Sequence, residues 1–179
     1  MKTAVGGTAL YGAWNPHWSA DKMAFIERDE KKRKLKLIEQ HHHTIRHHLA
    51  TLNKPYQIVG MAWMQGETDT RTQESSSHYL RNLTTLIADY RHAFQTPEMP
   101  FVMGQVNMVR SHYKPGITKV REAIATLARQ DPYSSMVATS LDPSWSDFPK
   151  HKDNTHYNTQ GQQRLGTAMA HKLMPYLAR

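Results

Sequence analysis

The chain has 179 residues, of which 39% are hydrophobic, and it carries 9 Gly and 9 Pro. This length and composition fit one globular domain with a core of its own, and they argue against a disordered or a membrane-spanning protein. The absence of Cys excludes disulfides, thiolate metal ligands and a cysteine nucleophile, and it leaves the cellular compartment open. A net charge of +8 permits anionic partners but does not choose among nucleic acid, acidic polysaccharide and lipid.

Short apolar runs alternate with helical spacings of apolar residues along the chain. The apolar runs predict strands over residues 2–5, 56–66, 100–109 and 135–142. The helical spacings predict helices over residues 27–54, 74–95, 116–130 and 159–177. This alternation favours an α/β fold with a parallel sheet and helices on both faces, in which ligands bind beyond the carboxyl ends of the strands. The loops after residues 5, 64, 107 and 142 are therefore expected to line a site.

The stretch DNTHYNTQGQQRLG, residues 153–166, places Asp153 three residues before His156 at the entry of the last helix. A carboxylate that accepts a hydrogen bond from the Nδ1–H of histidine fixes the tautomer and leaves Nε2 free to act as a base. Such a base activates a hydroxyl nucleophile. The alternative is that Asp153 only caps the helix and His156 lies on the surface.

Two more polar motifs follow predicted strands. WMQGETD, residues 63–69, brings Gln65, Glu67 and Asp69 to a strand end, where Gln65 could donate to a developing oxyanion. AVGGTAL, residues 4–10, has a Gly pair that allows a tight turn and presents a backbone N–H. Each motif alone is also compatible with an ordinary turn.

Together these three motifs, with VREAI at residues 120–124, resemble blocks of the SGNH hydrolases, and specifically of the carbohydrate acetylesterases of the sialate O-acetylesterase and acetyl xylan esterase type. The resemblance covers nearly the whole chain. It implies a three-layer α/β/α, flavodoxin-like fold in a single domain over residues 1–179. It also implies a serine esterase that removes O-acetyl groups from carbohydrates without a metal or cofactor.

The resemblance assigns roles to individual residues. It implies that Asp153 and His156 are the acid and base of a catalytic triad, and that Gly6 and Gln65 donate hydrogen bonds to the oxyanion. Further residues are expected to bind substrate or support the site, namely Gly7, Glu67, Asp69, Asn107 and Trp14.

The nucleophile of the resembled family lies in a GQSN-like block at the end of its first strand, and this sequence has no such block before Gly6. None of the candidate serines lies in a Gly-flanked strand-to-helix turn, the context that exposes a nucleophile. The serines considered are Ser19, Ser75, Ser76, Ser77, Ser111, Ser134, Ser135, Ser140, Ser144 and Ser146. We therefore expect an N-terminally incomplete domain that lacks a central strand between residues 2–5 and 56–66. A preceding segment or a second chain is expected to complete the sheet and to supply the serine.

Three alternatives compete with an active esterase. An inactive carbohydrate-binding remnant of the family could stack sugars on aromatic side chains, namely Trp14, Trp18, Trp145 and Tyr157. A nucleic-acid-binding protein could use the basic run from Lys31 to Lys36, although acidic residues flank this run and favour a solvated helix face. A metal could bind His43 and His47, which are spaced i, i+4, but no HExxH motif accompanies them.

Overall fold

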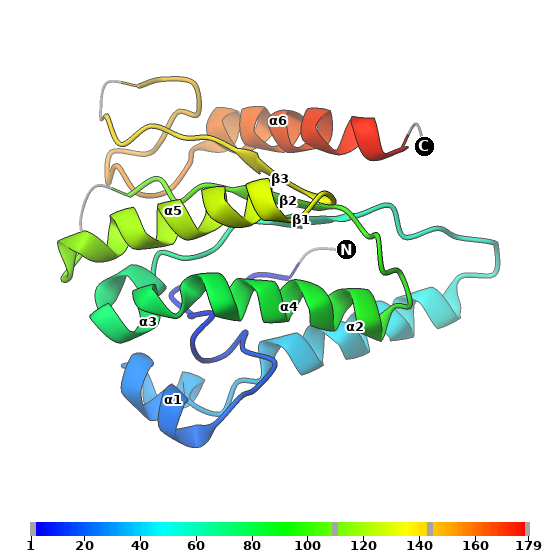
Figure 1. The fold of residues 1–179 in the computed structure, drawn as a ribbon, viewed down its shortest axis with the longest axis horizontal. Helices are drawn as coiled ribbons and strands as arrows, with labels where there is room; N and C mark the ends of the chain where they lie inside the picture. Colours follow the sequence, from blue (N-terminus) through cyan, green and yellow to red (C-terminus); the bar gives the residue numbers. More distant parts are fainter. Residues whose placement is uncertain (1–2, 109–110, 143–144, 178–179) are drawn as a thin grey trace.

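A computed structural model describes residues 3–108, 111–142 and 145–177 of the chain. The described residues form three layers, with helices on both sides of a small sheet (Figure 1). Helix α6 covers one face, and α4 and α5 lie on the opposite face with α2 beyond them. The predicted three-layer α/β/α fold is therefore confirmed.

The sheet contains three parallel strands in the order β1-β2-β3, namely β1 Met61–Trp63, β2 Phe101–Gly104 and β3 Ser134–Val137. Met61 pairs with Phe101, and Phe101 pairs with Ser134. All four residues of β2 are buried, as expected for a central strand covered on both faces. The predicted parallel sheet is confirmed, although each strand is shorter than its apolar run. Residue 109, the last of one run, lies outside the described residues.

Helices connect the strands and flank them. They are α1 Ala20–Ile26, α2 Leu37–Thr51, α3 Gln73–Ser77, α4 Tyr79–Ala93, α5 Lys114–Gln130 and α6 Thr159–Leu177, with 3-10 turns η1 Glu30–Lys32 and η2 Asp69–Arg71. The prediction for α6 matches its observed bounds, and α5 begins two residues before its predicted start. The predicted helix 74–95 is divided at His78 into α3 and α4.

Two predicted elements are wrong. Residues 3–5 of the expected strand 2–5 form no strand, and residue 2 lies outside the described part of the chain. The expected helix 27–54 begins only at Leu37, because Glu27 and Asp29 accept hydrogen bonds from backbone N–H groups two residues ahead and hold the preceding segment in turns. Leu37 N donates to Ala13 O at 2.8 Å, which fixes the start of α2.

The core divides between the two faces of the sheet. The larger cluster joins α2, α4 and α5 to the sheet and includes the fully buried side chains Tyr79, Tyr90 and Phe101. The smaller cluster packs Val102 and Val137 under Leu165 and Met169 of α6. The polar side chains of Gln65, Glu67 and His156 lie together at the end of the sheet at which β1 finishes.

Two histidines of α2 are buried against α4. His41 Nδ1 lies 2.6 Å from Tyr90 Oη, and His42 Nε2 lies 3.4 Å from Asp89 Oδ2. Burial lowers the pKa of both histidines, so the folded protein keeps them neutral. Below about pH 6.5, the ordinary pKa of histidine, the unfolded chain binds protons at these two side chains that the folded chain does not bind. The free energy of unfolding therefore decreases as the pH falls through this range.

We predict that acidification from about pH 8 to below 6.5 lowers the free energy of unfolding more in the native chain than in the H41N/H42N variant. Urea titrations of both proteins across this range measure the effect. The variant keeps every other titrating group, so the difference between the two pH profiles isolates these histidines. Parallel profiles would contradict the prediction.

Candidate active site

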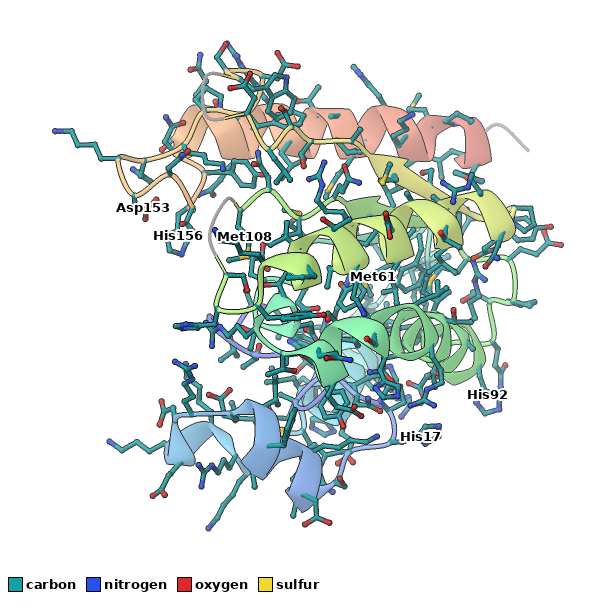
Figure 2. All side chains as sticks on the ribbon, turned by 60° about the vertical axis from the view of Figure 1, so that its left-hand side comes forward. His17, Met61, His92, Met108, Asp153 and His156 are labelled. Carbon is teal, nitrogen blue, oxygen red and sulfur yellow. The ribbon has the colours of Figure 1, made fainter. Side chains whose placement is uncertain are left out.

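A cleft of about 460 Å³ opens beside the carboxyl end of β1. It is lined by residues 3–8, by β1 and the loop that follows it, by Met108 after β2, and by Thr155 and His156. Figure 2 shows Asp153 and His156 projecting near Met108 at this end of the molecule. The loops after residues 5 and 64 thus line one site, as predicted, whereas the loop after 142 begins with residues outside the described part.

Asp153 and His156 form a hydrogen-bonded pair. His156 Nδ1 lies 2.7 Å from Asp153 Oδ2, and Asp153 Oδ1 accepts from the backbone N–H groups of Thr155 and His156. These hydrogen bonds, led by the one from His156, hold the pKa of Asp153 well below its ordinary value. The His156 side chain is 78% exposed, so its ring is oriented but not covered. This geometry leaves Nε2 directed away from the carboxylate, as a general base requires.

Lys150 anchors the loop that carries this pair. Its Nζ donates to Asn107 O at 2.7 Å, to Asn107 Oδ1 at 2.9 Å and to Asn154 O at 3.1 Å. Asn107 follows β2 and is buried, so the ammonium group joins the loop to the end of the central strand. Asn107 is therefore a supporting residue that does not itself line the cleft.

The Gly pair forms a turn at the mouth of the cleft, and both glycines line it. Gly7 has φ +75°, a left-handed conformation that favours glycine. Gly6 O accepts from Lys32 Nζ at 2.9 Å, which brings the η1 turn over this segment. The carbonyl of Gly6 is thus held by a cation, while the turn faces the same cleft as His156.

Gln65 and Asp69 belong to a buried hydrogen-bond network. Asp69 accepts from Leu10 N, Tyr11 N and Gln65 Nε2, each at 2.8 Å. Gln65 Nε2 also donates to Thr8 O at 3.1 Å, and Tyr79 Oη donates to Gln65 O at 2.7 Å. Both hydrogens of the Gln65 amide are therefore engaged inside the protein. An oxyanion could accept a hydrogen bond from Gln65 Nε2 only if the amide gave up its hydrogen bond to Thr8 O or to Asp69 Oδ2.

The titration of Asp69 is shifted by its surroundings. Complete burial raises the pKa of Asp69 to about 6, although donation from Gln65, Leu10 and Tyr11 favours the carboxylate. Asp69 is consequently a structural anion that fixes the segment from Thr8 to Tyr11 against the loop after β1. Gly66, at φ +139°, permits this loop to turn where a Cβ would meet Val106 at 2.7 Å.

Glu67 and Trp14 also line the cleft, as the sequence suggested. Burial raises the pKa of Glu67, and its own and Gly66 backbone N–H groups together with His156 partly counteract this. Trp14 is 5% exposed, donates from Nε1 to Thr8 Oγ1 at 3.1 Å and packs edge-on against Trp63. Trp14 therefore supports the wall of the cleft and has little surface for stacking on a sugar.

None of the serines in the described part of the chain lines this cleft. Ser134 and Ser135 lie in β3 and Ser75 to Ser77 in α3, whereas Ser144 is outside the described residues. The cleft adjoins the outer edge of β1, since Ala62 is one of its lining residues. Met61 N donates to Pro100 O, and because a parallel strand directs alternate residues to opposite sides, the N–H and C=O of Ala62 point away from β2. No described strand pairs with that edge, and Ala62 is exposed.

Known proteins resemble this chain in sequence and in fold. The sequence model of the family described as carbohydrate esterase, sialic acid-specific acetylesterase, matches residues 1–175. The chain belongs to this carbohydrate esterase family. The resemblance drawn from the three motifs is thereby confirmed at the level of the family.

One curated relative and one solved structure show how much of the chain and of the fold is shared. The chain is 28% identical over 114 residues to a probable carbohydrate esterase of Arabidopsis thaliana. The matched region covers 64% of this chain and 39% of that protein. An X-ray structure of a protein from Arabidopsis thaliana is similar with a TM-score of 0.62 at 24% identity, over 95% of this chain and 58% of that one. The chain thus spans less than two thirds of either protein, and the structural likeness shows the fold.

Sequence reasoning missed several residues that hold or line this cleft. Lys150 carries no motif, and its role depends on a contact with Asn107 that is 43 positions away. Arg121, inside VREAI, donates to Val106 O and to Thr139 O and so joins the segments after β2 and β3. Arg71 lines the cleft and adds a positive charge to its wall.

The structure also bears on the alternative interpretations. Within the ranges that the structure describes, no group of three or more His, Asp or Glu side chains is placed to hold a metal ion. The rings of His43 and His47 stack with centroids 6.5 Å apart on the surface of α2. Among the described helices, none combines the length and the hydropathy that crossing a bilayer would need. Trp18 and Trp145 pack against Lys36 and Phe148 and do not line the cleft.

We predict that Asp69→Ala destabilises the fold by about 3–5 kcal/mol, because three buried donors lose an anionic acceptor at once. Urea unfolding at neutral pH measures the loss. Asp147→Asn, an exposed change, is the control and should alter the free energy of unfolding by less than about 0.5 kcal/mol. A loss below about 1 kcal/mol for Asp69→Ala would show that the network contributes little.

Proposed function

We propose that this protein is the Asp–His part of a serine esterase that removes O-acetyl groups from carbohydrates. The observation that carries the proposal is the 2.7 Å hydrogen bond between His156 Nδ1 and Asp153 Oδ2, beside a cleft that the Gly6–Gly7 turn also lines. Membership of a carbohydrate esterase family supports the substrate class. The acetyl group as the acyl part rests on the description of that family.

The nucleophilic serine is proposed to come from a segment outside the 179 residues, either of the same polypeptide or of a second chain. Two features support this. The free edge of β1 offers the N–H and C=O of Ala62 to a further strand, and the cleft separates this edge from residues 3–5. A parallel strand placed there would end beside the Gly6–Gly7 turn and His156, where the serine is needed.

The chemistry then follows from the geometry. His156 Nε2 accepts the proton of the serine as its oxygen attacks the acetyl carbon, and Asp153 stabilises the resulting imidazolium. The backbone N–H of Gly6 or Gly7 faces the carbonyl oxygen as it becomes an oxyanion, and Gln65 fixes this turn through Thr8. His156 returns the proton to the departing sugar oxygen, and a water molecule deprotonated by His156 then hydrolyses the acetyl-serine.

Glu67 is proposed to support His156 through its negative charge at the same cleft, and Arg71 to contact polar groups of the substrate. The side chain of His156 is hydrogen-bonded to Asp153, and among the described contacts neither Glu67 nor Arg71 is hydrogen-bonded to it. We therefore expect them to affect substrate affinity and the pH profile more than the chemical step.

The first test compares His156→Ala with His151→Ala in the protein that includes the serine-bearing segment. His156→Ala should reduce hydrolysis of 4-nitrophenyl acetate by at least about 1,000-fold, because the serine loses its base. His151 is an exposed side chain in the same loop, and its replacement should leave the rate within about twofold. Turnover retained by His156→Ala would refute the assignment.

The second test concerns the 179-residue chain alone. We predict that a serine-directed fluorophosphonate does not label it stoichiometrically, whereas it labels the protein with the additional segment once per active site. Intact-mass spectrometry measures both reactions. Stoichiometric labelling of the chain alone would mean that one of its own serines is the nucleophile, and the labelled peptide would identify it.

A further inference from the structure

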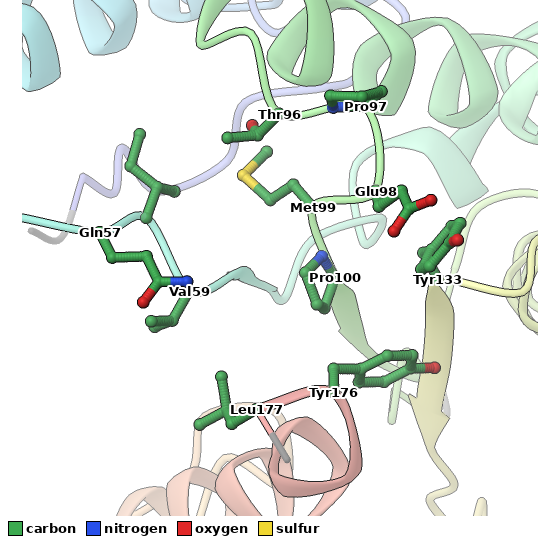
Figure 3. A pocket seen from close by; sticks show the side chains of 11 residues that line it. Gln57, Val59, Thr96, Pro97, Glu98, Met99, Pro100, Tyr133, Tyr176 and Leu177 are labelled. Atoms are coloured by element: carbon green, nitrogen blue, oxygen red, sulfur yellow. The ribbon is translucent and has the colours of Figure 1, made fainter. Parts of the chain in front are cut away.

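A second cavity, of about 580 Å³, lies at the opposite end of the sheet from His156. It is formed where chain segments approach the amino ends of the strands: residues 57–59 before β1, residues 96–100 before β2, Tyr133 before β3, and Tyr176 with Leu177 at the end of α6. Figure 3 shows these segments surrounding one space. Its volume is within the roughly 300–1,000 Å³ of small-ligand pockets.

The walls of this cavity are held by a half-buried ion pair. Arg91 Nη2 donates to Asp131 Oδ2 at 2.8 Å, and Arg91 Nε donates to Met99 O at 3.1 Å. Asp131 in turn accepts from Tyr133 N at 3.1 Å and from Ser134 Oγ at 2.6 Å. One guanidinium therefore fixes the 96–100 segment and the turn before β3 relative to each other, so the cavity is formed before any ligand binds.

The lining combines flat apolar surfaces with dispersed polar groups. Met99, Pro97 and Pro100 provide apolar contact together with the rings of Tyr133 and Tyr176. Gln57 and Glu98 project polar ends around the same space (Figure 3). Thr96 Oγ1 is buried within the wall and has no hydrogen-bond partner among the described residues, so the polar side-chain groups open to a ligand are those of Gln57 and Glu98.

We propose that this cavity binds a neutral saccharide, as a second carbohydrate site remote from the esterase cleft. A sugar ring presents an apolar C–H face and a rim of hydroxyl groups. The tyrosine and proline surfaces suit the apolar face, and the hydrogen-bonding groups of Gln57 and Glu98 suit the hydroxyl groups. The proposal does not depend on esterase activity, since no residue is shared with the cleft of His156.

The charges around the cavity disfavour other ligands. Among the described residues, Glu98 is the only charged side chain that lines it, so an anion would meet repulsion there, and the nearby Arg91 guanidinium is already paired with Asp131. A cationic ligand would compete for Tyr133, because the Arg91 guanidinium already lies 5.9 Å from the centroid of that ring. A neutral ligand with several hydroxyl groups avoids both the repulsion by Glu98 and the competition with Arg91.

The test is a titration followed by two-dimensional ¹H–¹⁵N NMR, with xylobiose, cellobiose and chitobiose as separate probes. At least one should produce saturable shifts of the amide signals of residues 57–59, 96, 98, 99 and 133, since Pro97 and Pro100 have no backbone N–H. Tyr176→Ala and the exposed change Gln57→Ala should each weaken that binding about fivefold or more. Met174→Ala, in the same turn of α6 but outside the cavity, is the matched control and should bind as the native chain does.

Two further arms separate the outcomes. His156→Ala should bind the sugar unchanged, because that residue lies at the other end of the sheet. Choline is the cationic probe and should not saturate the cavity, whereas Glu98→Gln, which keeps a hydrogen-bonding side chain, should reduce sugar binding only slightly. The proposal is overturned if no sugar shifts these residues, if sugars shift only residues 6–8 and 155–156, or if choline alone saturates the cavity.

Discussion

The buried carboxylate of Asp69 is the interaction on which the rest of the site depends. Its three donors come from the chain segment near the N-terminus and from Gln65 after β1, so one side chain joins parts of the chain that are 58 and 59 positions apart. Burying a charge without partners would be costly, and each of these donors offsets part of that cost. The Gly6–Gly7 turn has no strand to hold it, and it keeps its place because the residues that follow it are tied to this anion.

The general architecture could be predicted from sequence because it depends on local pattern. The apolar periodicity of α5 and α6 and the apolar runs of β2 and β3 carry enough information to place a parallel sheet between helices. The Asp153–His156 contact was predictable for the same reason, since the two residues are only three positions apart. The start of α2 could not be predicted in this way, because Leu37 N donates to the carbonyl of Ala13, a distant residue that the local sequence pattern does not indicate.

The parts of the site that sequence did not indicate all involve distant pairs. Lys150 with Asn107, and Arg121 with the carbonyls of Val106 and Thr139, use side chains that sequence alone would assign to the surface. Gln65 illustrates the opposite case. Its motif correctly located it at the cleft, but its amide is occupied by Thr8 and Asp69, which only coordinates could reveal.

The edge of β1 that no described strand pairs with has a consequence for stability. A segment that pairs there binds only the folded chain, so each increment of its binding energy also opposes unfolding. Pairing of a strand with this edge and folding of the chain are then thermodynamically linked. A substitution at Gly60 or Ala62, far from any proton transfer, would reduce both together, and the unoccupied edge would leave the chain open to pairing with its own copies.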